Sequence, residues 1–143
     1  MDHTTSTPSL AQRIYEEGSK KGIKTVDAPV SGGDVGAKEG KLVTMCGGDA
    51  ETIQTIRPIL ECYSRKVEHN GSSGKGQHTK MANQIVLAGN MAGMVEGLLY
   101  ASKMGLNVEQ MIETVCSGAA SSTALSVMGP RIAQGNYNPG FYV

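Results

Sequence analysis

Residues 74–84 read Gly-Lys-Gly-Gln-His-Thr-Lys-Met-Ala-Asn-Gln and open a segment without proline that continues to residue 104. Apolar side chains recur in this segment at intervals of three and four, which predicts one long helix over residues 77–104 with a buried face. We expect that face to consist of Met81, Ile85, Ala88, Met91, Ala92, Val95, Leu98 and Leu99. The other predicted elements are arranged before and after this helix.

Polar side chains gather at the start of the predicted helix. Because residues three and four positions apart are neighbours on a helix surface, the Lys80 ammonium should lie beside the carboxamides of Asn83 and Gln84. Near a cleft, such a group could bind an oxygen atom and donate a proton to it. A lysine on a helix is more often a solvated surface charge, so a catalytic Lys80 needs support from the rest of the chain.

A glycine-rich stretch occupies residues 27–37, which read Asp-Ala-Pro-Val-Ser-Gly-Gly-Asp-Val-Gly-Ala. Its glycines leave backbone N–H groups uncovered, and Ser31 adds a hydroxyl donor. Loops at the carboxyl ends of strands bind ligands in α/β folds, so this stretch could hold a carboxylate. The glycines taken alone favour a flexible turn. A phosphate-binding loop is excluded, because no Gly-Lys-Ser/Thr closes the stretch.

The remaining elements mix helix and strand before residue 76 and are helical after the long helix. Thr7 and Pro8 form a helix start, because a capping hydroxyl precedes a proline at the first helical position. Strands are predicted at residues 23–28, 41–46 and 64–69, with a helix capped by Asp49 before the last of them. Two further helices are expected after Asn107 and Ser122, and residues 135–143 are expected to form a loop.

Composition limits the classes of partner and site. Lys plus Arg and Asp plus Glu each number 13, so the chain has no basic field for nucleic acid. Three cysteines are scattered singly, which predicts neither a disulfide framework nor a metal site and suits a reducing compartment. No apolar run reaches about 18 residues, so no membrane partner is expected. We expect a cytoplasmic location, or the mitochondrial matrix or a plastid if a transit peptide is removed.

Three motifs resemble the β-hydroxyacid dehydrogenase family, the group around 3-hydroxyisobutyrate dehydrogenase and tartronate semialdehyde reductase. The first is Asp-His-Thr-Thr-Ser-Thr-Pro at residues 2–8, and the second is the glycine-rich stretch at residues 27–37. The third combines Gly74 and Gly76 with Lys80, Asn83 and Gln84. The resemblance extends over essentially all 143 residues.

The resemblance implies an α/β fold cut from a larger one. Residues 1–76 correspond to the C-terminal part of a Rossmann-like NAD(P)-binding domain that lacks the N-terminal Gly-x-Gly-x-x-Gly unit. Residues 77–143 correspond to a long interdomain helix and part of an all-helical domain. The family's late lysine, in a Lys-Asp-Leu stretch, is also missing, so the chain is expected to be an internal piece of a longer enzyme. In the family, the helical part packs against a second subunit, which implies a homodimer or a higher oligomer.

The resemblance also implies a role for each residue of the motifs. Ser31, Gly32 and Gly33 would hold the substrate carboxylate, and Lys80 would be the general acid or base. Many relatives carry an asparagine at the position of Gln84, so either Asn83 or Gln84 would orient the substrate. Thr5 would lie against the nicotinamide end of NAD or NADP.

The expected activity is hydride transfer between NAD(P) and a small 3-hydroxy acid or its semialdehyde. These 143 residues alone are expected to be inactive, because the unit that binds the pyrophosphate is absent from the sequence. The alternative is a non-catalytic binding or dimerisation module derived from such an enzyme. The motifs leave the individual hydroxy acid and the choice between NAD and NADP open.

Overall fold

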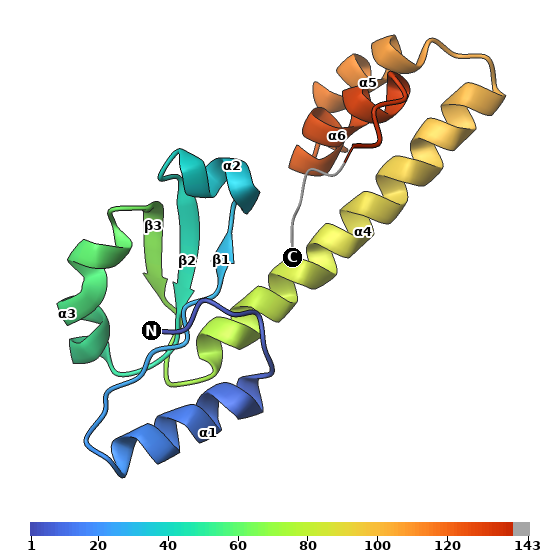
Figure 1. Ribbon diagram of the computed structural model, residues 1–143. Coiled ribbons are helices and arrows are strands. Elements are labelled where there is room, and N and C mark those ends of the chain that lie inside the picture. The colour runs from blue at the N-terminus through green and yellow to red at the C-terminus, as the bar shows by residue number, and fades with distance from the viewer. Residues whose placement is uncertain (139–143) are drawn as a thin grey trace. The chain divides into compact units, whose positions relative to one another are not determined.

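The computed structural model describes residues 1–138, which form two compact units. The first unit comprises Met1–Asn83, and the second begins at Gln84. The long helix α4 (Lys75–Lys103) contributes its first turns to one unit and its remaining turns to the other (Figure 1). The observed elements confirm the expected α/β fold with a small sheet and a long helix. The domain boundary between residues 76 and 77 stays a prediction.

The first unit begins with α1 (Pro8–Ser19), and its start confirms the predicted cap. The Thr7 side chain accepts a hydrogen bond from the backbone N–H of Leu10, and Pro8 occupies the first turn, where its missing N–H leaves no intrahelical bond unmade. The helix ends at Ser19, and Gly22 adopts a φ of 70° in the turn that follows.

The prediction of a strand at residues 23–28 was wrong, because the structure has no strand there. Only Asp27 forms ladder contacts there, as isolated bridges to Asp2 and to Gly47. A strand requires partners at consecutive positions, and in the described chain Asp2 supplies one residue only, bonding to the backbone of Val26 and Ala28. The apolar signal at Val26 and Ala28 reflects burial in the core instead.

The sheet contains three strands in the order β1 (Val30–Ser31), β2 (Leu42–Cys46) and β3 (Ser64–His69). β1 runs antiparallel to β2, and β2 runs parallel to β3 (Figure 1). The bounds of β2 and β3 confirm the sequence prediction to within one residue. Val30 pairs with Thr44 and Ser31 with Val43.

The stretch predicted as a loop after residue 27 is more ordered than expected. It contains β1 and the short helix α2 (Gly33–Lys38). Gly32 turns the chain between them with a φ of 133°, a conformation that side chains rarely allow. The prediction failed because β1 depends on pairing with β2, whereas the glycines give only a local signal for a turn.

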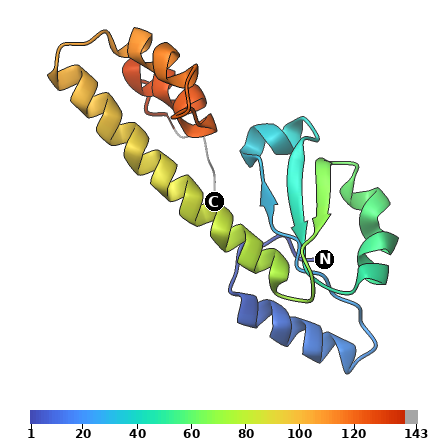
Figure 2. The same cartoon turned by 180° about the vertical axis from the view of Figure 1, so that it is seen from behind.

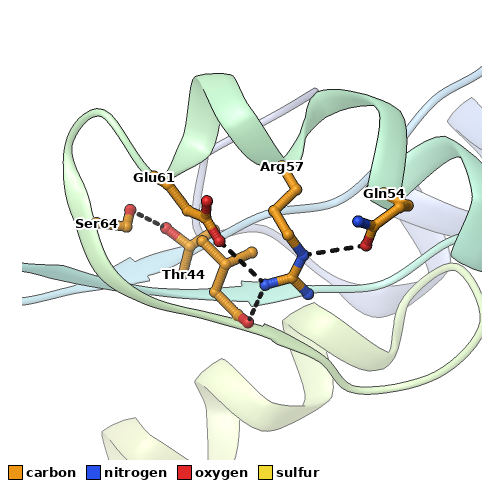
Figure 3. Close-up of polar contacts among 6 residues, drawn as sticks. Thr44, Gln54, Arg57, Glu61 and Ser64 are labelled. Carbon is orange, nitrogen blue, oxygen red and sulfur yellow. Dashed lines mark hydrogen bonds and ion pairs between the residues drawn. The ribbon is translucent and has the colours of Figure 1, made fainter.

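Helix α3 (Ala50–Leu60) packs on the sheet of the first unit. Asp49 stands at the helix start as predicted, but its carboxylate accepts a hydrogen bond from the Tyr15 hydroxyl instead of capping the helix. Arg57 links α3 to β3, because its guanidinium donates a hydrogen bond to the Val67 carbonyl at 3.2 Å. The same guanidinium also contacts the side chains of Gln54 and Glu61 (Figure 3). The core beneath comprises Val26, Ala28, Cys46, Ile53, Leu60 and Val67.

The second unit combines the later turns of α4 with α5 (Val108–Cys116) and α6 (Thr123–Ala133), as Figure 2 shows from behind. Asn107 and Ser122 cap α5 and α6, so both predicted helix starts are confirmed. The core of this unit consists of Met94, Leu98, Ile112, Ala124 and Leu125. The predicted terminal loop is observed at residues 136–138, and residues 139–143 lie outside the described residues.

The buried face predicted for α4 is only partly correct. Leu98 is buried, but Ile85 is 74% and Leu99 62% exposed, and the buried stripe instead continues through Met94 and Ala101. The helix is apolar on several sides, so its periodicity could not identify the face that packs in this unit. By length and composition alone α4 could cross a membrane, but this is weak evidence, because core helices of soluble proteins meet the same criterion. The absence of a membrane partner stays a prediction.

Candidate functional site

Segments far apart in the sequence meet at the first turns of α4. Residues 2–6 and residues 27–31 both bond to the stretch between Gly74 and Lys80, and all lie in the first compact unit. These are the three motifs that the sequence analysis singled out. The fold therefore brings together groups that the chain separates by 47 to 73 positions.

Asp27 anchors the start of α4. Its carboxylate is buried and accepts hydrogen bonds from the backbone N–H of Gly74 at 2.8 Å and of Gln77 at 3.0 Å. The first N–H groups of a helix have no partner within the helix, and the helix dipole favours an anion beside them. The buried carboxylate thus gains partners and fixes where α4 begins.

The glycine at position 76 is required by this anchor. A Cβ atom there would collide with the Met45 carbonyl oxygen and would lie 2.8 Å from Oδ2 of Asp27. The Met45 oxygen and the Asp27 carbonyl oxygen, which would lie 2.9 Å away, both belong to the backbone, so the helix start would have to move. Close packing of α4 on residues 27 and 45 therefore explains the glycine at position 76, whereas the glycine at position 74 has a φ of 86°.

Gln77 joins α4 to the amino-terminal segment. Its side chain is fully buried; Nε2 donates to the Thr4 carbonyl at 2.6 Å, and Oε1 accepts from the Ser6 N–H at 3.1 Å. The residue between these two partners is Thr5, which is exposed. The segment that carries Thr5 is thus held directly against the helix that carries Lys80.

Lys80 lies beside the strand that leads into the glycine turn. Its Nζ donates to the Val30 carbonyl at 2.8 Å, and the side chain is half-buried. Burial of the ammonium lowers the pKa of Lys80 below its ordinary value of 10.5. Ser31 follows Val30 directly and is half-buried, whereas Gly32 and Gly33 are exposed at the turn. The structure therefore places Lys80 next to the residues proposed to bind a carboxylate.

The two amide candidates fall on different sides of the division between the units. Asn83 is half-buried in the first unit, three positions after Lys80. Gln84 is exposed and belongs to the second unit. Asn83 therefore shares a compact unit with Lys80 and with Ser31, Gly32 and Gly33, whereas Gln84 does not.

Sequence reasoning missed Asp27 and Gln77 as parts of this arrangement. Both lie inside motifs that it quoted, but neither has a local pattern that distinguishes a buried polar side chain from a solvated one. It also missed His3, whose ring bonds to the Ala28 carbonyl at 2.6 Å and to the Tyr63 hydroxyl at 2.9 Å. His3 thereby ties the amino-terminal segment to the glycine-rich stretch.

Other reactive groups do not add a second centre to this region. Burial raises the pKa of the Cys46 thiol to about 11, so the thiol is protonated at neutral pH and is a weak nucleophile. Among residues 1–138, no group of three or more His, Cys, Asp or Glu side chains could hold a metal ion. The polar groups of this region include the backbone N–H groups of the glycine turn, the Ser31 hydroxyl and the Lys80 ammonium.

Two family models together match nearly the whole chain. Residues 1–71 match the NAD binding domain of 6-phosphogluconate dehydrogenase. Residues 74–143 match the model described as NAD-binding of NADP-dependent 3-hydroxyisobutyrate dehydrogenase. The junction between the two matches falls at the glycine-rich connection immediately before α4.

Individual relatives align along the full chain. The chain is 46% identical over 143 residues to the Bacillus subtilis protein named "Uncharacterized oxidoreductase YkwC". That alignment covers 100% of this chain and 50% of the Bacillus protein. It is 48% identical to the Arabidopsis thaliana protein named "Probable 3-hydroxyisobutyrate dehydrogenase-like 1, mitochondrial", with 100% of this chain and 42% of that one covered. The chain thus spans about half the length of the curated relatives it matches.

A solved structure shows the same architecture. The Mycobacterium tuberculosis 3-hydroxyisobutyrate dehydrogenase, determined with L-serine, superposes with a TM-score of 0.87 at 31% identity. The superposition covers 98% of this chain and 50% of that one. Taken with the two family models and the shared motifs, these matches show that the chain belongs to the β-hydroxyacid dehydrogenase family.

Proposed function

We propose that this chain is the substrate-binding and proton-transferring part of an NAD(P)-dependent dehydrogenase that acts on a small 3-hydroxy acid or its semialdehyde. One observation carries the proposal: the Lys80 ammonium lies 2.8 Å from the carbonyl of Val30, directly before the exposed turn at Gly32 and Gly33. A proton donor thus stands near an exposed turn whose two glycines carry no side chain over their backbone N–H groups. A molecule with a carboxylate and a nearby hydroxyl fits both.

Each residue of the site has a chemical role in this proposal. The backbone N–H groups and the hydroxyl at Ser31, Gly32 and Gly33 hold the carboxylate, which orients the reacting carbon. In the reducing direction, the Lys80 ammonium stabilises the developing alkoxide and then protonates it. In the oxidising direction, neutral Lys80 accepts the proton of the hydroxyl. Asn83 orients the substrate oxygen, and Gln84 is the alternative for that role.

The residues present fit one end of the cofactor. When bound, NAD or NADP supplies hydride transfer. Thr5 is exposed while the backbone on both sides of it is fixed by Gln77, so it offers a rigid contact for the nicotinamide end. The sequence contains no Gly-x-Gly-x-x-Gly turn to bind the pyrophosphate. We therefore expect the 143 residues alone to be inactive, and we call the complete dehydrogenase that would contain them the full-length enzyme.

The exposed apolar surface of α4 favours a second candidate function. Ile85, Val86, Leu99 and Tyr100 are all exposed in the isolated chain. A helix that is apolar on several sides needs cover from more than one neighbour, which supports a homodimer or a higher oligomer. The alternative function is accordingly a non-catalytic binding or dimerisation module. The cytoplasmic, mitochondrial or plastid location remains a prediction in either case.

Replacing Lys80 distinguishes the two candidates. In the full-length enzyme, Lys80→Ala should reduce turnover by about a hundredfold or more, because general acid–base catalysis contributes roughly 10²–10⁴-fold. The dissociation constant of NAD(P), measured by calorimetry, should change little. Lys75→Ala is the matched control, since Lys75 lies on the same helix and is exposed. Turnover of Lys80→Ala within a few-fold of wild type would refute the assigned role.

A further inference from the structure

The side-chain amide of Gln77 forms hydrogen bonds to the backbone on both sides of one exposed residue, Thr5. The amide donates to Thr4 and accepts from Ser6, which are separated from it by 73 and 71 positions in the sequence. The side chain is fully buried, whereas Thr5 is exposed. Because the two bonds are on either side of Thr5, they fix its backbone position without occupying its side chain.

The same helical turn also fixes Lys80. The backbone N–H of Gln77 donates to the buried Asp27 carboxylate at 3.0 Å, and Lys80 follows three residues later with its Nζ on the Val30 carbonyl. Three residues of α-helix advance by about 4.5 Å along the axis. One rigid turn of α4 therefore holds both the segment that carries Thr5 and the amine.

We infer that Gln77 is a positioning residue that sets Thr5, and with it the nicotinamide end of the cofactor, relative to Lys80. This inference rests on the proposed function. A neutral carboxamide offers a donor and an acceptor at once, which the Thr4 carbonyl and the Ser6 N–H require together. An ionised glutamate can satisfy only Ser6, and a methionine of similar length can satisfy neither.

Gln77→Met in the full-length enzyme tests the inference kinetically. The variant should lower kcat/KM for NAD(P) at least tenfold, because a small displacement of a bound reactant is costly. The KM for the hydroxy acid should stay within twofold, since the turn at Gly32 and Gly33 does not contact Gln77 through any of these bonds. Ser64→Ala is the control: it removes a buried 2.7 Å hydrogen bond to Thr44 in the sheet, and should lower Tm without changing either kinetic constant.

Gln77→Glu supplies a second readout that does not depend on the stability of the methionine variant. A protonated carboxyl can donate to Thr4 and accept from Ser6, and burial favours the protonated form. The ratio of kcat/KM in Gln77→Glu to that in wild type should therefore rise as the pH falls, at pH values where both proteins are folded by circular dichroism. The rise should be absent in the ratio for Ser64→Ala.

Two results would overturn the inference while leaving the proposed function intact. One is a Gln77→Met enzyme that has a lower Tm but keeps the wild-type kcat/KM for NAD(P). The other is a ratio of kcat/KM between Gln77→Glu and wild type that does not change with pH. Either would reduce Gln77 to a purely structural contact in an enzyme that still depends on Lys80. If the wild-type enzyme oxidises no 3-hydroxy acid with NAD or NADP, the proposed function itself fails and the inference falls with it.

Discussion

At the scale of single residues, the side chain of Lys80 combines two properties that proton transfer needs. It is placed by a hydrogen bond to Val30, and its charged form is disfavoured because burial removes part of its hydration. An amine with a pKa closer to the working pH exchanges protons more readily in both directions of a redox reaction. Asp27 and Gln77 contribute indirectly, since they fix the helical turn on which Lys80 stands.

The lowered pKa of Lys80 predicts the pH dependence of the reaction. In the proposed mechanism oxidation requires the neutral amine, so kcat/KM for oxidation should rise with pH around a midpoint below 10.5, while the reduction rate falls over the same range. Lys80 should also make stability depend on pH. Between its lowered pKa in the folded chain and its ordinary value in the unfolded chain, the unfolded chain binds more protons than the folded chain, so the free energy of unfolding should increase with pH. Initial rates and urea unfolding across this range measure both effects. Identical profiles in Lys80→Met would contradict the assignment.

At the scale of elements, α4 serves each unit in a different way. Its first turns are fixed by hydrogen bonds to the buried Asp27 carboxylate and to the Thr4 carbonyl, whereas its later turns are held by apolar packing of Met94 and Leu98. Hydrogen bonds are directional and packing is not, so only the first turns define the position of a functional group closely. The glycines of α4 differ in the same way: Gly76 is closely packed against other segments, whereas a side chain at Gly89 would meet no atom within 4 Å.

Substituting two glycines of α4 should have opposite effects on stability. Gly76→Ala places a methyl group against the Met45 carbonyl and the Asp27 carboxylate, and should destabilise the first unit by about 1–3 kcal/mol. Gly89→Ala meets nothing within 4 Å and should stabilise the helix by roughly 0.5–1 kcal/mol. Urea unfolding followed by circular dichroism gives both values. A neutral Gly76→Ala would show that the start of α4 is not closely constrained.

At the scale of the whole molecule, residues 1–138 contain two hydrophobic clusters, one in each compact unit, so each unit has a core of its own. The groups proposed for catalysis lie in the first unit, with Gln84 as the exception. We therefore predict that the chain folds but is not catalytically competent by itself. The cores can form from the residues present, whereas tight cofactor binding needs a phosphate anchor that the sequence does not contain.

Calorimetric titration of the 143-residue chain with NAD and NADP should detect no micromolar binding. The missing anchor comprises several charge-assisted hydrogen bonds, each contributing about 1.5–3 kcal/mol, and every 1.4 kcal/mol changes affinity about tenfold. Circular dichroism on the same sample should show a folded protein. The full-length enzyme is the positive control. Micromolar binding by the short chain would mean that the cofactor is held elsewhere than proposed.

The sequence by itself determined the elements whose signals are local. The cap at Thr7, the caps at Asn107 and Ser122, and the strand Ser64–His69 were all predictable, because each depends on residues a few positions apart. The motifs also identified Lys80 and the turn at Gly32 and Gly33 as candidates. Their roles remain predictions that the experiments above address.

Only the tertiary structure decided which residues pair over long distances. Residues 23–28 lack a ladder although they read as a strand, and residues 30–31 form one because β2 lies beside them. Asp27 and Gln77 read as ordinary polar residues until the fold buries them against backbone groups 47 to 73 positions away. A buried polar side chain is stable only when its partners are supplied, and those partners come from segments that folding alone brings together.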